Sequence, residues 1–244
     1  MEKAKAAIIN RLQKDILRWQ GFNPATADNH RRIGLGPIEQ AFPNGIFPTG
    51  TIHEMLCPTA EGSAATCGFL AGLLTSLSAK EGVCLWISTR RKLFPPSLNA
   101  FNAEADRLIF IDLARERDVL WAAEEALKCE GLAAVIAEVD AITFAQSRRL
   151  QLAVESSKVT GFILRNNLKK LSSTICVARW QITPLTSYTE DKLPGVGFPR
   201  WQVELLRVRN GNPGIWKLEW NNQGFSVIEE SVALPEVIHH LNAG

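Results

Sequence analysis

The sequence predicts an α/β protein with a mainly parallel sheet, helices on both faces of that sheet and an antiparallel extension at its C-terminal end. Two observations lead to this prediction. Between Gly50 and about residue 167, continuous apolar segments typical of buried strands alternate with helical patterns. From Ser173 onward, apolar and polar residues alternate, and turn sequences such as RNGNPG and NNQG join the segments, as in antiparallel hairpins.

The N-terminal part begins with a predicted amphipathic helix over residues 3–19, KAKAAIINRLQKDILRW. The apolar positions on one face of this helix are Ile8, Leu12, Ile16 and Trp19. Such a stripe either packs on its own domain or docks on a partner. Residues 21–50 are rich in Gly, Pro and Asn, and we expect them to form a connector with little regular structure.

The core is expected to begin with a strand near Thr51, followed by a small-residue loop and the helix TCGFLAGLLTSLSAK. The next predicted strands are VCLWIST (83–89), DRLIFIDL (106–113), LAAVIAEVD (132–140) and VTGFILRNN (159–167). Helices are predicted in VLWAAEEALKC (119–129) and QSRRLQLAVESSK (146–158). The antiparallel strands are expected in STICVARWQITPL (173–185), RWQVELLRVRN (200–210), GIWKLEWN (214–221) and FSVIEE (225–230).

The last segment, VALPEVIHHLNAG, is expected to be a short helix with a frayed end. Its apolar residues have no evident place in the sheet, so Val237, Ile238 and Leu241 are candidates for partner binding. The predicted organisation is therefore an N-terminal helix and connector (1–49), a core (50–230) and a C-terminal tail (231–244).

Composition places the chain among ordinary globular proteins. It has 244 residues, with 27 Lys and Arg against 25 Asp and Glu. This near balance argues against a dedicated nucleic-acid surface but leaves a local basic patch open. The five cysteines are scattered and no leader precedes them, which indicates buried thiols in a reducing cytoplasm. No apolar run approaches the roughly 18 residues of a membrane span, and the four dispersed histidines predict no metal site.

The stretch from Cys57 to Ala64 has the context of a phosphate-binding loop, because a strand, small residues and a helix follow one another. On the pattern G-x-x-x-x-G-K-[ST], Cys57 replaces the first Gly and Gly62 is kept. Ser63 stands in place of the Lys and Ala64 in place of the Ser or Thr, while Glu61 adds a repelling carboxylate. We expect a degenerate P-loop that does not bind ATP; an ordinary strand-to-helix turn is the alternative.

The order of elements over residues 50–220 resembles a RecA-like core, and within that superfamily the sequence resembles the ImuA family. The closer resemblance lies in HEML, VLWAAEEALKCEGLAAVIAEVD, SRRLQLAVESS and, most specifically, the 26-residue stretch GVGFPRWQVELLRVRNGNPGIWKLEW. ImuA proteins are encoded beside ImuB, an inactive Y-family polymerase homologue, and beside an error-prone replicative-type polymerase. The resemblance thus implies DNA repair by translesion synthesis in the SOS response.

The resemblance also implies that the catalytic groups of a RecA-type ATPase are missing. Arg90 stands where the strand 83–89 would end in the catalytic glutamate. Glu138 or Asp140 is a vestigial Walker B residue, although acidic residues at a strand end are also explained by solvation. The DNA-binding loops are replaced by short connections, Ala141 to Gln146 and Asn166 to Ser172. We therefore expect no enzyme activity, no cofactor and no metal.

Three functions remain open at this stage. The first is a non-catalytic adaptor, a pseudo-ATPase, that binds an ImuB-like partner, with the error-prone polymerase, RecA and a second copy as further partners. The others are a degenerate ATPase and a cell-division inhibitor of the SulA kind that binds FtsZ. Weak DNA binding through Arg148, Arg149, Lys169 and Lys170 is a further prediction, with a solvated surface as the alternative.

Overall fold

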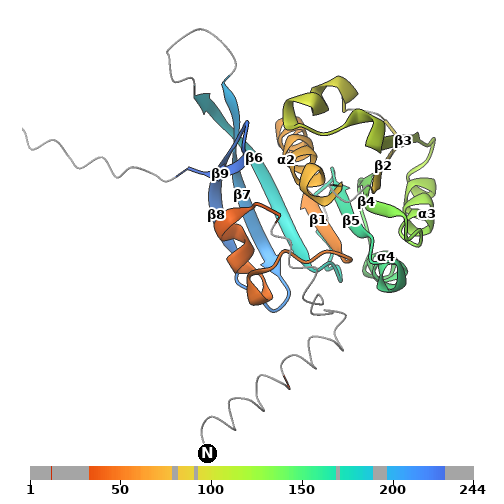
Figure 1. The fold of residues 1–244 in the computed structure, drawn as a ribbon. Coiled ribbons are helices and arrows are strands. Elements are labelled where there is room, and N and C mark those ends of the chain that lie inside the picture. The colour runs from red at the N-terminus through yellow and green to blue at the C-terminus, as the bar shows by residue number, and fades with distance from the viewer. Residues whose placement is uncertain are drawn as a thin grey trace, which may run out of the picture.

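The computed structural model describes residues 12, 33–78, 82–90, 93–168, 171–188 and 197–228. Within these residues one sheet has the strand order β3-β2-β4-β5-β1-β6-β7-β8-β9 (Figure 1). The parallel strands are β1 (Ile52–Leu56), β2 (Val83–Ser88), β3 (Leu108–Asp112), β4 (Leu132–Val139), β5 (Thr160–Arg165) and β6 (Ala178–Tyr188). The antiparallel strands are β7 (Phe198–Val208), β8 (Gly214–Asn221) and β9 (Gly224–Val227). The predicted α/β class with an antiparallel extension is confirmed.

One face of the sheet is covered by α2 (Ala60–Ser78), a helix whose Phe69, Leu70 and Leu73 are fully buried. Trp180 of β6 and Trp201 of β7 pack into the same core. The 3₁₀ turn η4 (Pro95–Phe101) lies beside α2, and η5 (Ala105–Arg107) follows it in contact with η4. Burial of these apolar side chains stabilises the packing of α2 on this face.

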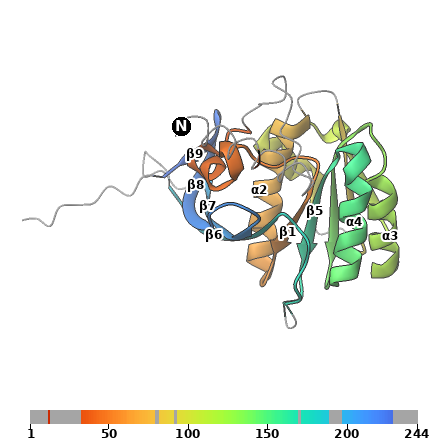
Figure 2. The same cartoon turned by 90° about the horizontal axis from the view of Figure 1, so that it is seen from below.

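The opposite face carries α3 (Glu116–Ala126) and α4 (Phe144–Ser157), which lie next to each other over the parallel strands (Figure 2). Their apolar sides pack on Ile52, Val135 and Ile163 of the sheet. The α4 helix begins with a capping box, in which Thr143 Oγ1 accepts from the Gln146 N–H and the Gln146 side chain accepts from the Thr143 N–H. None of the described helices is long and apolar enough to cross a bilayer.

Residues 33–47, which were expected to belong to a connector, form part of the core. They contain the 3₁₀ turns η2 (Gly36–Ala41) and η3 (Pro43–Gly45), and the antiparallel strands curl around η2 (Figure 2). The buried apolar side chains of this segment are Ile33, Leu35, Ile38, Ala41, Phe42 and Phe47. The segment thus has little regular structure, as expected, but its apolar side chains belong to the same core as α2 and Trp180.

Two predicted boundaries differ from the structure by five residues or more. The helix after β1 starts at Ala60, six residues before the predicted start at Thr66. Strand β6 starts at Ala178, five residues after the predicted start at Ser173. The residues before it bond elsewhere: Ser172 Oγ donates to the Ile142 carbonyl, and the Ile175 N–H donates to Ser147 Oγ of α4. Of the described cysteines, only Cys129 is exposed, and none forms a disulfide.

Candidate functional site

The candidate site consists of the connection from β1 to α2 and the polar groups at the carboxyl ends of the neighbouring strands. The connection is Cys57-Pro58-Thr59, only three residues long, since α2 begins at Ala60. The Cys57 N–H donates to the carbonyl of Arg165 on β5 at 2.9 Å, which draws the connection onto the sheet. Three residues cannot wrap around a phosphate group in the manner of a phosphate-binding loop.

The N-terminus of α2 satisfies its own N–H groups. Thr59 Oγ1 accepts from the Gly62 N–H at 3.0 Å, and the Ser63 N–H donates to the Thr59 carbonyl at 2.9 Å. The pKa of the Glu61 carboxyl is lowered because it accepts from its own backbone N–H and from the Thr59 hydroxyl. These interactions place the chain's own oxygens where a bound phosphate would need free N–H donors.

The side chains of the degenerate loop do not face a common ligand position. Ser63, in place of the lysine, is buried in α2, while Ala64 is exposed. A Cβ added to Gly62 would meet Thr59 Oγ1 at 3.4 Å and the Ile182 carbonyl at 3.6 Å, which are ordinary contacts. The space around residue 62 therefore does not require a glycine at this position.

A cavity of about 230 Å³ lies at the carboxyl ends of β2, β4 and β5. It is lined by Thr89, Arg90, Glu116, Glu138, Val139, Asp140 and Asn166. The structure thus brings together Arg90, Glu138 and Asp140, which the sequence singled out separately. None of residues 57–64 lines this cavity. The degenerate phosphate-binding loop and the Walker B residues, which a nucleotide site would bring together, therefore do not line the same cavity.

Two of the three carboxylates that line this cavity, those of Glu138 and Glu116, accept hydrogen bonds from the protein itself. Glu138 is buried, and its Oε1 accepts from Trp86 Nε1 at 2.7 Å. Glu116 Oε1 accepts from the backbone N–H groups of Asp140 (2.8 Å) and Ala141 (3.1 Å), which joins α3 to the end of β4. No group of three or more potential metal ligands occurs among the described residues.

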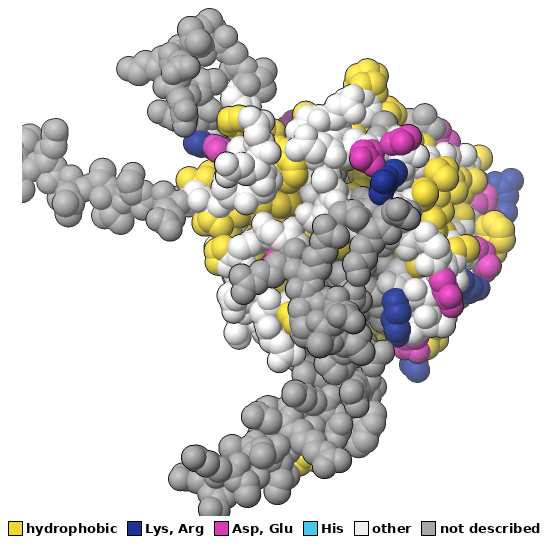
Figure 3. All heavy atoms as spheres, viewed as in Figure 1, with side chains coloured by type: hydrophobic (Ala, Val, Ile, Leu, Met, Phe, Trp, Pro, Cys, Tyr) yellow, Lys and Arg dark blue, Asp and Glu magenta, His cyan; other side chains and the backbone are white. Residues whose placement is uncertain are grey.

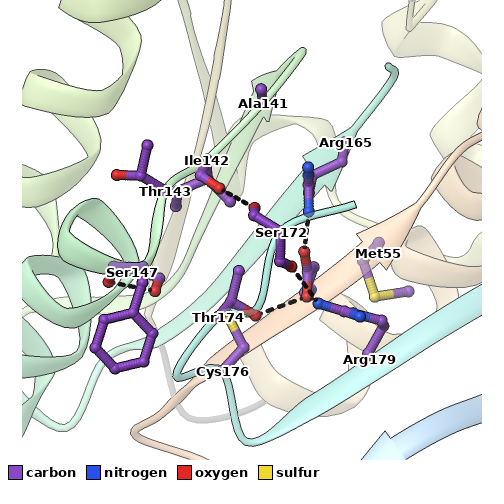
Figure 4. A network of polar contacts seen from close by, with 12 residues as sticks. Met55, Ala141, Ile142, Thr143, Ser147, Arg165, Ser172, Thr174, Cys176 and Arg179 are labelled. Atoms are coloured by element: carbon purple, nitrogen blue, oxygen red, sulfur yellow. Dashed lines mark hydrogen bonds and ion pairs between the residues drawn. The ribbon is translucent and has the colours of Figure 1, made fainter. Parts of the chain in front are cut away.

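A buried polar network that the sequence did not predict surrounds Glu54 of β1 (Figure 4). Glu54 has no exposed side-chain surface and accepts from Arg165 Nη1 (2.7 Å), Arg179 Nε (2.7 Å) and Thr174 Oγ1 (2.8 Å). Burial raises the pKa of the neighbouring Cys176 thiol to about 11, with the charge of Glu54 as a second cause, so this thiol stays protonated. The only sequence signal was a charged residue inside each of three apolar strands.

Some of the residues predicted to bind a partner or DNA belong to the described part of the chain. Leu12 is exposed (54%), whereas Ile8, Ile16, Trp19, Val237, Ile238 and Leu241 lie outside the described residues, as do Lys169 and Lys170. Arg149 forms an ion pair with Glu124 of α3 (2.6 Å), which reduces its availability for DNA.

Trp121 of α3 was not singled out from the sequence, yet its side chain is 63% exposed. It lies on the side of the helix opposite the buried Val119 and Ala123. Figure 3 shows hydrophobic and charged side chains mixed over the side of the molecule where α3 lies. The helical phase of residues 116–126 could have predicted this exposure.

The fold and the site together define a class of protein: a RecA-like α/β core in which a capped helix replaces the phosphate-binding loop. Known proteins support a closer placement. The chain is 34% identical over 204 residues to Protein ImuA of Caulobacter vibrioides in two strains, NA1000 / CB15N and ATCC 19089 / CIP 103742 / CB 15. The match covers 79% of this chain and 84% of each relative, and the chain belongs to the ImuA family. No family model matches it.

Proposed function

We propose that this protein is a non-catalytic adaptor of damage-induced, error-prone translesion synthesis in the cytoplasm, where it binds an ImuB-like polymerase homologue. Membership of the ImuA family supports a role in the DNA damage response. The error-prone replicative-type polymerase and RecA are further partners in this proposal.

The start of α2 is the observation that carries the non-catalytic part of the proposal. Thr59 caps the helix, Ser63 is buried in place of a lysine, and Glu138 at the carboxyl edge accepts a hydrogen bond from Trp86. A nucleotide would have to displace the Thr59 cap and meet the Glu61 carboxylate without a lysine at position 63 to offset its charge. The retained strand, turn and helix then serve the fold, and the function lies on the surface.

Calorimetric titration with Mg·ATP tests this part. We expect no binding at millimolar nucleotide and no ATP hydrolysis, with an ATPase that has an intact phosphate-binding loop as the positive control. A dissociation constant below about 100 μM, equivalent to about −5.5 kcal/mol, would contradict the proposal. Hydrolysis that disappears in Glu138→Gln would support a degenerate ATPase instead.

The partner surface is proposed at the two ends of the chain. The stripe Ile8, Leu12, Ile16 and Trp19 has the spacing of a helix that docks in a groove, and the exposure of Leu12 agrees with a free apolar side. The double variant Ile16→Ala/Trp19→Ala is expected to lose copurification with the ImuB-like partner, because a buried Trp often contributes about 2 kcal/mol or more to an interface. Deletion of residues 231–244 is expected to have the same effect.

The matched control is Asn10→Ala/Lys14→Ala, which changes the opposite face of the same predicted helix and should leave binding intact. Circular dichroism checks that each variant keeps the folded core. If the end variants retain wild-type binding, the interface lies on the core, and the exposed Trp121 becomes the next residue to replace with Ala.

A further inference from the structure

Two arginines near the end of β7 lie over the connection between β5 and β6, on the face of the sheet that carries α3 and α4. Arg207 Nη2 donates to the carbonyls of Thr174 (2.9 Å) and Cys176 (3.1 Å). Arg209 Nη2 donates to the carbonyl of Ile175 at 2.7 Å. Both guanidinium groups are thus held in place by main-chain oxygens, and each keeps further N–H donors.

A third arginine lies directly opposite Arg207. Arg179 of β6 is its cross-strand partner, and like charges in opposed positions of an antiparallel pair repel each other. Arg179 also donates from Nη2 to the carbonyl of Ser172 at 2.9 Å, so it holds the same connection. Arg179, Arg207 and Arg209 are called the arginine cluster below.

The negative charge near this cluster is too small to balance it. Glu54 is the one carboxylate of the connected network, and Arg165 and Arg179 already engage both of its oxygens. Within the part of the chain that the structure describes, neither Arg207 nor Arg209 forms an ion pair. The pKa of Arg209 is lowered by burial and by the charge of Arg207, and residues 156–189 contain no Asp or Glu at all.

Half-buried charges are normally paired, so a surplus of arginine at one place indicates an anion from outside the chain. A phosphate group suits this arrangement better than a carboxylate, because its oxygens can be shared among several guanidinium groups. The main-chain carbonyls also fix the guanidinium groups before binding, which lowers the entropy cost of each contact.

We propose that the arginine cluster binds the phosphate backbone of nucleic acid without regard to sequence. This activity goes beyond the adaptor function, which requires no contact with DNA. It can be measured on the purified full-length chain without any partner, so its failure would leave the adaptor proposal untouched.

The test is fluorescence anisotropy with a labelled single-stranded oligonucleotide at roughly 50 mM and roughly 200 mM salt. We expect binding that weakens as salt rises. The double variant Arg207→Gln/Arg209→Gln should bind at least about tenfold more weakly. The slope of the logarithm of its binding constant against the logarithm of the salt concentration should be smaller in magnitude by about 1.4, because each lost phosphate contact to a single strand removes about 0.7.

The matched control is Arg115→Gln/Arg117→Gln, which removes the same charge from the start of α3 and should keep the wild-type slope. A second variant, Arg207→Lys/Arg209→Lys, keeps the charges and should keep the slope while it binds more weakly. This lysine variant decides the question if the glutamine variant fails to fold.

Several outcomes would overturn the proposal. These are no binding by the wild-type chain at low salt, and an equal loss in the α3 control. Binding of polyglutamate in place of DNA would assign the cluster to an acidic protein segment. Thermal stabilisation by inorganic phosphate that depends on the cluster, without oligonucleotide binding, would assign it to free phosphate.

Discussion

His53 is enclosed in the core on the α2 side of β1. Its ring stacks on Phe47 with centroids 4.7 Å apart, and its Nε2 lies 2.8 Å from the Pro48 carbonyl. Trp180 Nε1 donates to His53 Nδ1 at 3.2 Å. Because an indole N–H can only donate, Nδ1 must accept and Nε2 must carry the proton, which makes the ring neutral. Burial lowers the pKa of His53 from 6.5 to about 4.

This pKa shift predicts a pH dependence of stability. Below pH 6.5 the unfolded chain binds a proton at His53 that the folded chain takes up only near pH 4. The contribution of the neutral His53 ring to the free energy of unfolding, about 3 kcal/mol, is complete above pH 6.5. It is lost progressively as the pH falls from 6.5 to about 4. Urea unfolding of the wild type and of His53→Gln should show a stability difference that shrinks over this range. A difference that stays constant with pH would contradict the neutral buried ring.

At the scale of single elements, the sequence located every strand of the sheet but misplaced the start of α2. Pro58 and the small residues after it are typical of a loop, and they hid the capping residue Thr59. The polar network around Glu54 was out of reach for another reason. Its partners Arg165 and Arg179 come from other strands. Only the register of the sheet, which the sequence pattern does not specify, puts Arg179 opposite Glu54 and Arg165 opposite Leu56, two residues further along β1.

Two glycines of α2 give a matched prediction. Gly62→Ala should stabilise the protein by about 0.5–1 kcal/mol, since Ala is the better helix former and the added Cβ makes only ordinary contacts. Gly72→Ala should destabilise it instead, because the added Cβ would lie 2.7 Å from Trp220 Cζ3 and 2.9 Å from Phe225 Cζ. Thermal unfolding of both variants measures the signs. Destabilisation by Gly62→Ala would indicate that this glycine still serves a loop geometry.

At the scale of the whole molecule, the core does not begin at Gly50. The six buried apolar side chains from Ile33 to Phe47 lie in the same core as α2 and Trp180. The sequence could not show this, because the segment lacks a helix or strand period and its burial depends on the curl of β6 to β9 around it.

Deletion of residues 1–49 is therefore expected to abolish folding. Burial of a large apolar side chain contributes about 1.5–3 kcal/mol, so the loss of five such side chains approaches the whole stability of a domain, about 5–15 kcal/mol. Deletion of residues 1–32 keeps this segment and should preserve a cooperative unfolding transition in urea. If the chain that lacks residues 1–49 still folds, the segment 33–47 is not needed for the fold, and the domain begins at Gly50.

The central place of β1 also affects how the chain reaches its folded state. His53 pairs with Phe162 of β5 and Ala178 of β6, more than about a hundred positions further along the chain. At a synthesis rate of roughly 5–20 residues per second, β1 waits for roughly 5–20 s before either neighbour exists. During that time its apolar side chains are uncovered and Glu54 lacks its arginines. Such long-range pairing slows folding. The time for which chaperones and proteases can act on the nascent chain therefore depends on this delay as well as on the stability of the folded protein.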